Sequence, residues 1–183
     1  MISPSAKQGF DSLLQQAMRN SMVPAGDHCE ISVLAHPEDI KGERMVVLTV
    51  SSYLFRLMVM FHFTEDDATR AYFSRLSDTE CPETGEGSVV DVIAEYGNLC
   101  CGILNRDLGR FFPHIGMSTP NVIDRHCVDY LPMLACDHIQ HFAIDSDSGL
   151  RLCLTLCVTA YAEIDFCVIE EESEQSTGEL ELF

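Results

Sequence analysis

Residues 88–112 constrain the fold of this chain more than any other segment. They read SVVDVIAEYGNLCCGILNRDLGRFF. At about 100° per residue the apolar side chains fall on one broad side, as in an amphipathic helix that packs on a core. This side consists of Val89, Val92, Ile93, Tyr96, Cys100, Ile103 and Leu104. Ser88 suits an N-cap and Asp91 suits the first turn. We therefore predict a long helix with one buried face.

A narrow polar strip follows the opposite side of this predicted helix. Its members are Asp91, Glu95, Asn98, Gly102 and Arg106. Glu95 and Asn98 are three residues apart, so they are surface neighbours that point the same way. Asn98 and the glycines Gly97 and Gly102 are poor helix formers, and Glu, Lys or Gln would suit a solvated helix face better. These residue choices indicate a function rather than helix stability.

The rest of the sequence predicts an α+β fold in which helices pack on an antiparallel sheet. Helical spacing occurs at residues 5–21 and 64–76. Strand patterns occur at residues 29–35, 43–51, 53–63, 118–123, 138–144 and 150–160, whereas 124–137 reads as irregular. The turn sequence DSDSG at 145–149 makes the last two strands a hairpin.

The length of 183 residues fits one domain, which we predict at residues 1–169. Residues 170–183 contain six glutamates and form a predicted acidic tail. No apolar run approaches the roughly 18 residues of a membrane span, and the first ten residues lack the pattern of a signal peptide. We therefore predict a cytoplasmic protein with no membrane association.

Charge and cysteine content exclude several classes of protein. The formal net charge is −18, and Lys7 and Lys41 are the only lysines, which argues against binding to nucleic acid or to an anionic membrane. The nine cysteines are an odd number and contain no C-x-x-C pair. Most lie within apolar patterns, where a reduced cysteine acts as a small core residue. We interpret them as free thiols.

Two groups of cysteine and histidine residues resemble a reactive thiol pair and a metal site. For each group, the sequence argues against such a site. The vicinal pair Cys100-Cys101 places Cys100 on the core side of the helix. The group Cys136, His138 and His141 lies near His126-Cys127 but has no standard zinc spacing. On one strand His138 and His141 point to opposite faces. We therefore predict no metal site.

The central helix resembles a motif of the CheC/CheX-like chemotaxis phosphatases. Residues 95–102, EYGNLCCG, match the family pattern E-x-x-N-x-x-x-G, and residues 119–123, TPNVI, are similar to the short proline-containing strand that follows it. The order of the predicted elements over residues 5–168 is also that of the family. The resemblance implies a CheC-like fold.

The number of motifs distinguishes branches of this family. CheC-type members carry two E-x-x-N helices, whereas the first helix here offers QAMR at 16–19 and LLQQ at 13–16. The single site at Glu95 and Asn98 therefore resembles the CheX-like branch.

The resemblance implies a substrate and roles for the strip. The substrate would be the phosphoaspartate of a CheY-like response regulator, which supplies its own Mg²⁺, so this chain needs no cofactor. Asn98 would hold the attacking water and Glu95 would pair with the regulator's lysine. Asp91, Gly102 and Arg106 would form the rim of the partner contact. Edge-to-edge pairing in CheX-like proteins implies a homodimer, and we expect one of the long, nearly uncharged strands at 53–63 or 150–160 to supply the edge.

Two other functions fit the sequence. A non-catalytic CheC-like module would bind a response regulator or another signalling partner without hydrolysis. A ligand sensor would use the aromatic and methionine-rich strands. The presence of both Glu95 and Asn98 favours the phosphatase over these alternatives.

Overall fold

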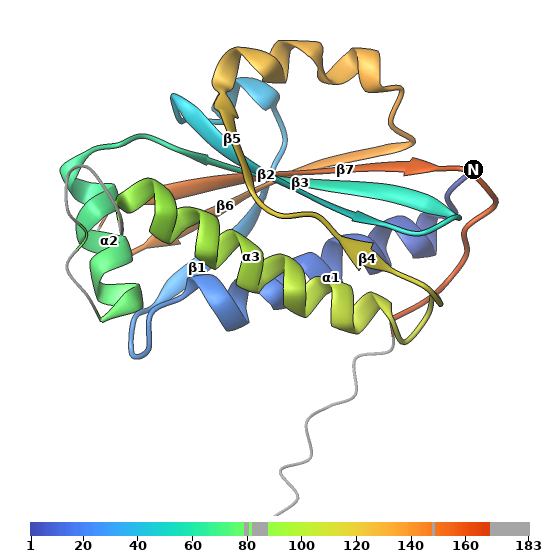
Figure 1. Cartoon of the computed structure of the whole chain (residues 1–183), viewed down its shortest axis with the longest axis horizontal. Helices are drawn as coiled ribbons and strands as arrows, with labels where there is room; N and C mark the ends of the chain where they lie inside the picture. Colours follow the sequence, from blue (N-terminus) through green and yellow to red (C-terminus); the bar gives the residue numbers. More distant parts are fainter. Residues whose placement is uncertain (79–80, 82–87, 148, 169–183) are drawn as a thin grey trace, which may run out of the picture.

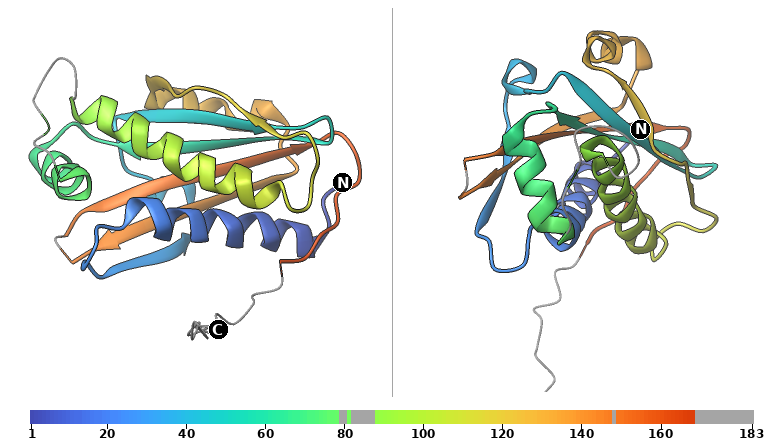
Figure 2. Two further views of the ribbon diagram at one scale, coloured as in Figure 1. Left: turned by 60° about the horizontal axis from the view of Figure 1, so that its bottom comes forward. Right: turned by 60° about the vertical axis from the view of Figure 1, so that its left-hand side comes forward.

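In the computed structural model three α-helices cover one face of a twisted sheet, and a long 3-10 helix lies on the other face (Figures 1 and 2). The structure describes residues 1–78, 81, 88–147 and 149–168. The helices are α1 (Pro4–Met22), η1 (Pro37–Asp39), α2 (Asp67–Ser77), α3 (Val89–Leu108) and η2 (Arg125–Leu134). The strands are β1 (Cys29–Leu34), β2 (Arg44–Ser51), β3 (Phe55–Phe63), β4 (Gly116–Met117), β5 (Asn121–Asp124), β6 (His138–Ser146) and β7 (Arg151–Ala160).

The sheet is antiparallel throughout, with strand order β1-β6-β7-β3-β2-β4. The short strands β4 and β5 both pair with β2, β4 at its end and β5 at its beginning. The extended segment predicted at 118–123 overlaps β5 at residues 121–123, whereas β4 ends just before that segment. The predicted α+β class and the order of helices and strands are confirmed, as is the hairpin of β6 and β7.

The expectation about the sheet edge is wrong. β3 lies between β2 and β7, and β7 lies between β3 and β6, so both of these long strands are interior. Each strand carries a single arginine, Arg56 or Arg151, and this low charge reflects burial on both faces rather than an edge that recruits a partner. β1 forms one edge of the sheet and the pair β4 and β5 forms the other.

Helix α3 begins as predicted, because the Ser88 side chain accepts a hydrogen bond from the Asp91 backbone N–H. It ends at Leu108, earlier than the predicted 88–112 segment, with Gly109 at the C-cap. The buried face is also shifted around the helix from the predicted one, since Val92, Tyr96 and Ile103 are only half-buried. Gly97 and Cys101, by contrast, are buried, since α3 packs on both the sheet and α1 (Figure 2).

The two glycines of the motif region have opposite environments. A Cβ atom on Gly97 would lie 3.2 Å from Leu48 Cδ1 and 3.3 Å from Phe61 Cε2, so Gly97 permits a close approach of α3 to β2 and β3. Apart from its own turn of α3, a Cβ on Gly102 would meet no atom of the described residues within 4 Å. Packing thus explains Gly97, whereas Gly102 belongs to an open surface.

We expect Gly97→Leu and Gly102→Ala to change stability in opposite directions. Gly97→Leu forces a side chain into a filled layer and should lower the free energy of unfolding by about 1–3 kcal/mol. Gly102→Ala adds a methyl group in open space and improves helix propensity, so it should raise that free energy by about 0.5–1 kcal/mol. Urea titration of both variants measures the two changes. Equal stability of the two variants would contradict the packing described for α3.

A small second core lies between the sheet and η2. Met45 and Met60 from the sheet pack there with Leu131 of η2 and Cys157 of β7. The segment predicted as irregular is therefore mostly a 3-10 helix, with Pro132 inside it. The aromatic side of β3 is likewise packed, because alternate residues from Phe55 to Phe63 join the main core under the helices. Both faces of the strands proposed for a ligand sensor are thus used in packing.

Two further predictions concern the acidic tail and membrane-spanning segments. The predicted acidic tail at 170–183 lies outside the described residues. None of the helices in the described part of the chain combines the length and the apolar composition that a bilayer span requires.

Candidate functional site

The polar strip of α3 lies on the side of the helix that faces away from the core. Glu95 is exposed and Asn98 is half-buried, one helical turn further along. Among the described residues, no group forms a hydrogen bond or ion pair with either side chain. Their carboxylate and amide are therefore available to a partner molecule.

An open groove of about 580 Å³ lies between the second half of α3 and strand β4. Its lining consists of Asn98, Leu99, Gly102, Ile103, Arg106, Met117, Ser118 and Thr119. Three of the predicted site residues, Asn98, Gly102 and Arg106, thus lie along one groove. Glu95 and Asp91 lie on the same helix beyond this lining.

The β4 side of the groove was not predicted as part of the site. Ser118 is held there because its Oγ accepts a hydrogen bond from Thr49 N at 3.0 Å and donates one to Thr119 O at 3.0 Å. Leu99, 47% exposed, was missed on α3 itself. Its position four residues after Glu95 and three before Gly102 was the signal that places it beside the strip.

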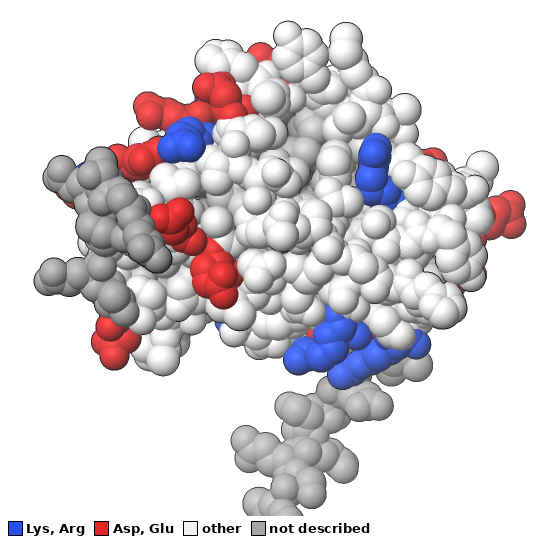
Figure 3. Space-filling view, in the orientation of Figure 1, with Lys and Arg blue, Asp and Glu red and all other residues white. Residues whose placement is uncertain are grey.

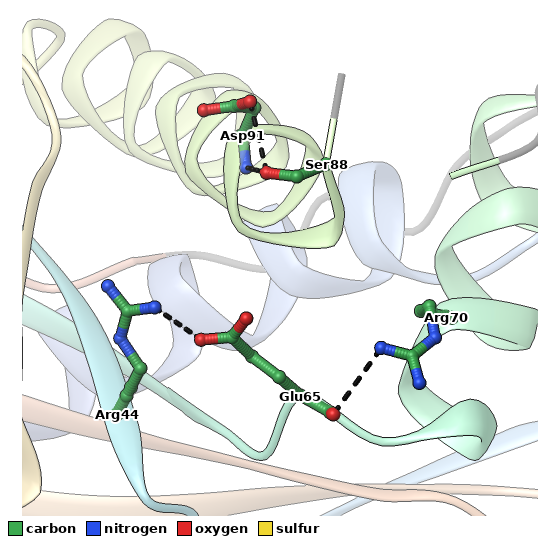
Figure 4. Close-up of polar contacts among 5 residues, drawn as sticks. All are labelled: Arg44, Glu65, Arg70, Ser88 and Asp91. Carbon is green, nitrogen blue, oxygen red and sulfur yellow. Dashed lines mark hydrogen bonds and ion pairs between the residues drawn. The ribbon is translucent and has the colours of Figure 1, made fainter. Parts of the chain in front are cut away.

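At the beginning of α3, Asp91 interacts with the N-cap residue Ser88. Ser88 Oγ donates a hydrogen bond to Asp91 Oδ2 at 3.1 Å, and the carboxylate lies in the first turn (Figure 4). The nearby Glu65 carboxylate is paired with Arg44, and the Glu65 carbonyl accepts a hydrogen bond from Arg70 at 3.4 Å (Figure 4). Asp91 is therefore partly committed to capping, unlike Glu95.

At the far end of α3, Arg106 is positioned by a buried acid. Asp107 is 4% exposed and accepts hydrogen bonds from Arg106 Nε at 3.0 Å and Nη2 at 3.2 Å. Arg110 approaches the same carboxylate at 3.7 Å. The hydrogen bonds that Arg106 donates to Asp107 raise the pKa of the Arg106 guanidinium, which stays charged at the mouth of the groove.

Charge is separated along the helix. Asp91 and Glu95 are exposed on its first half, and Arg106 and Arg110 are exposed at its end. Figure 3 shows acidic side chains over the beginning of α3, basic side chains near its end and an uncharged surface between them. A partner that lies along α3 meets opposite potentials at its two ends.

The cysteine and histidine groups do not form a second site. Cys100 and Cys101 are both buried, and burial raises the pKa of the Cys100 thiol to about 12, so neither is a reactive thiolate. His138 bonds to Asp11 of α1 at 2.8 Å on the helix side, whereas His141 bonds to Thr155. Within the described residues, no three His, Cys, Asp or Glu side chains are grouped to hold a metal ion.

A buried pair of histidines lies on the η2 side of the sheet. Thr155 Oγ1 is 2.9 Å from His62 Nε2 and 3.0 Å from His141 Nδ1. Burial, with the nearby His141 as a smaller cause, lowers the pKa of His62 to about 4. Burial lowers the pKa of His141 as well. Both rings are therefore neutral in the folded protein at neutral pH.

We expect this histidine pair to make the fold sensitive to mild acid. The folded pKa of His62 lies below its unfolded value of about 6.5, so its stabilising contribution is complete above that pH and declines as the pH falls toward 4. Between pH 7 and 5, His62 alone should cost about 2 kcal/mol of unfolding free energy. His62→Gln should reduce this pH dependence, whereas His28→Gln, at an exposed position, should not. Urea titrations at both pH values test this, and an unchanged slope in His62→Gln would contradict it.

Comparison with known proteins places the fold. No protein-family model matches the sequence, and no curated protein matches it. CheX in the CheX-CheY-BeF3-Mg²⁺ complex from Borrelia burgdorferi aligns over 83% of this chain and 96% of its own, with 11% identity and a TM-score of 0.58. CheX from Vibrio vulnificus aligns over 81% and 95%, with 16% identity and a TM-score of 0.58. A CheC-like protein from Shewanella sp. PV-4 covers 84% and 96%, with 13% identity and a TM-score of 0.55. The chain therefore has the fold of the CheX and CheC-like chemotaxis proteins.

Proposed function

We propose that this chain acts in chemotaxis-type signalling as a CheX-like phosphatase, which accelerates hydrolysis of the phosphoaspartate of a CheY-like response regulator. The observation that carries the proposal is the Asn98 amide, which bonds to no other residue that the structure describes and lies half-buried beside an open groove, with Glu95 exposed one turn before it. The likeness in fold to a CheX solved in complex with CheY, BeF3 and Mg²⁺ supports the class of partner.

The chemistry needs few groups from this chain. The regulator supplies its phosphorylated carboxylate, its lysine and the Mg²⁺ that neutralises the phosphoryl oxygens. An in-line water molecule still has to be fixed. The Asn98 amide can donate and accept hydrogen bonds, so it can hold this water on the line of attack. Glu95 would pair with the regulator's lysine and set the orientation of α3 in the partner's active site.

The proposal is tested by the decay of phosphorylated CheY-like regulators with and without the chain. Acceleration of at least one regulator, together with little hydrolysis of free phosphate esters, is the expected result, because the Mg²⁺ and the phosphoryl pocket belong to the partner. Binding without acceleration would instead identify a non-catalytic module. No effect on any regulator and no binding would remove both functions. Because the regulators are cytoplasmic signalling proteins, the proposal also places this chain in the cytoplasm.

We also propose that the chain forms a homodimer through β1. This strand pairs with β6 on one side and lies at the edge of the sheet, where Val33 is 56% exposed. An edge with unpaired backbone groups can add a strand from a second copy. Light scattering should give about twice the monomer mass of 20.4 kDa at micromolar concentration, and Val33→Lys should shift the population to monomer. A 20.4 kDa species alone at these concentrations would rule out the dimer.

A further inference from the structure

We propose that the groove beside Asn98 is a second contact for the response regulator and takes an apolar side chain of that partner with a carboxylate next to it. This contact selects among regulators, while Glu95 and Asn98 act on the phosphoryl group that all of them share. The inference rests on the proposed function, because it assumes that the regulator docks at Asn98.

The groove lies where a regulator that docks at Asn98 also covers it. Asn98 is one of the residues that line it, so a partner that brings a phosphoryl group to the amide must also lie over the groove. The surface beyond Asn98 is apolar, with Leu99 47% exposed and Ile103 and Met117 half-buried. Gly102 leaves this surface open, since a Cβ at its position would meet none of the described residues beyond its own helical turn within 4 Å. The space fits an apolar side chain of the partner.

Arg106 determines what accompanies that side chain. Asp107 engages its Nε and Nη2 atoms, which holds the guanidinium in one orientation and leaves Nη1 for another acceptor. The Arg106 side chain is 64% exposed, whereas the Asp107 side chain is 5% exposed. A carboxylate of the partner is the matching group for this oriented cation.

The charges along α3 give the contact a direction. Glu95 and Arg106 are separated by about 16 Å along the helix axis at 1.5 Å per residue. A regulator whose lysine meets Glu95 therefore places its carboxylate near Arg106 in one orientation, and the reverse orientation sets like charges against each other. Because the chain as a whole is strongly negative, this basic end of α3 is the place where an acidic segment of the regulator is tolerated.

The test compares matched substitutions inside and outside the groove. Arg106→Gln and Leu99→Ser change the contact. Arg110→Gln is the control for charge, since Arg110 also approaches Asp107 but lies outside the lining. Met133→Ser is the control for an exposed apolar side chain, on η2 across the sheet. For each protein, Kd is measured for a CheY-like regulator activated with beryllofluoride, and kcat and KM are measured for phosphoaspartate decay.

We expect each groove variant to raise Kd and KM by about tenfold, with kcat within about twofold of wild type. The two controls should stay within about twofold in all three constants. High salt should remove most of the Arg106→Gln effect and little of the Leu99→Ser effect.

The outcomes separate this inference from the proposed function. If wild type binds the regulators but accelerates none, phosphatase activity fails, and a Kd raised by the groove variants still supports the contact. If wild type accelerates decay and the groove variants keep its Kd and KM, the contact is overturned and the phosphatase stands. If wild type binds none of them, both are overturned. A change in self-association of Arg106→Gln, with regulator binding unaltered, would assign the groove to a second copy and overturn the inference.

Discussion

Replacement of Asn98 by alanine is expected to remove nearly all acceleration of phosphoaspartate hydrolysis while the complex still forms. The amide is the group proposed to hold the attacking water, and loss of such a group costs about 3–4 kcal/mol of transition-state stabilisation, or several hundredfold in rate. The decrease should fall on kcat rather than KM, because the interaction is made mainly in the transition state. Decay of phosphorylated regulator under saturating conditions measures it.

Two further variants make this prediction specific. Asn98→Asp keeps the shape of the side chain but replaces the amide donor by a charge next to the phosphoryl group, so it should also be slow. Asn20→Ala, at an exposed position near the end of α1, should match wild type. The unfolding free energy of all three variants should stay within about 0.5 kcal/mol of wild type, since these side chains are not in the core. A wild-type rate in Asn98→Ala would show that the mechanism is wrong.

Replacement of Glu95 is expected to act on binding. Glu95→Gln removes the charge that would pair with the regulator's lysine at a contact closed to water, and such losses cost about 2–5 kcal/mol. Kd for a beryllofluoride-activated regulator should therefore rise by at least about thirtyfold. Asp91→Asn is the matched control on the same side of α3, and it should change Kd much less because Asp91 interacts with Ser88.

Exchanging the charges of Glu95 and the regulator's lysine distinguishes a specific ion pair from a general effect of the negative surface around Glu95. Glu95→Lys should abolish binding to the normal regulator and regain part of it with a regulator whose lysine is changed to glutamate. An equal loss of binding in Asp91→Asn and Glu95→Gln would mean that the acidic surface acts as a whole, and it would contradict a specific role of Glu95.

The part of the site on α3 could be predicted because it follows a local rule. The 3.6-residue period places Glu95, Asn98, Gly102 and Arg106 on one side of a helix, and the structure shows that helix with Ser88 as its cap. The opposite wall could not be predicted in this way. It depends on the pairing of Val50 with Met117, residues far apart in the sequence, and short strands such as β4 leave no periodic pattern.

The burial of a charged side chain and the order of the strands also could not be predicted from local sequence patterns. Asp107 lies next to Arg106 in a polar stretch, which suggests two solvated side chains, yet its carboxylate is buried and organises two arginines. β3 and β7 looked like possible edge strands because each carries only one charged residue, but their position between β2 and β6 is a property of the whole sheet. Both errors arise where tertiary contacts decide the environment of a residue.

The firm attachment of α3 has a consequence for the thermodynamics of recognition. The helix packs on α1 and the sheet, and the Tyr96 hydroxyl donates a hydrogen bond to the Leu76 carbonyl at 2.7 Å. The backbone that carries Glu95 and Asn98 is thus already ordered before a partner arrives. Complex formation then loses little conformational entropy on this side and is expected to be limited by orientation rather than by rearrangement. Any slow, temperature-sensitive phase in association should therefore originate in the regulator.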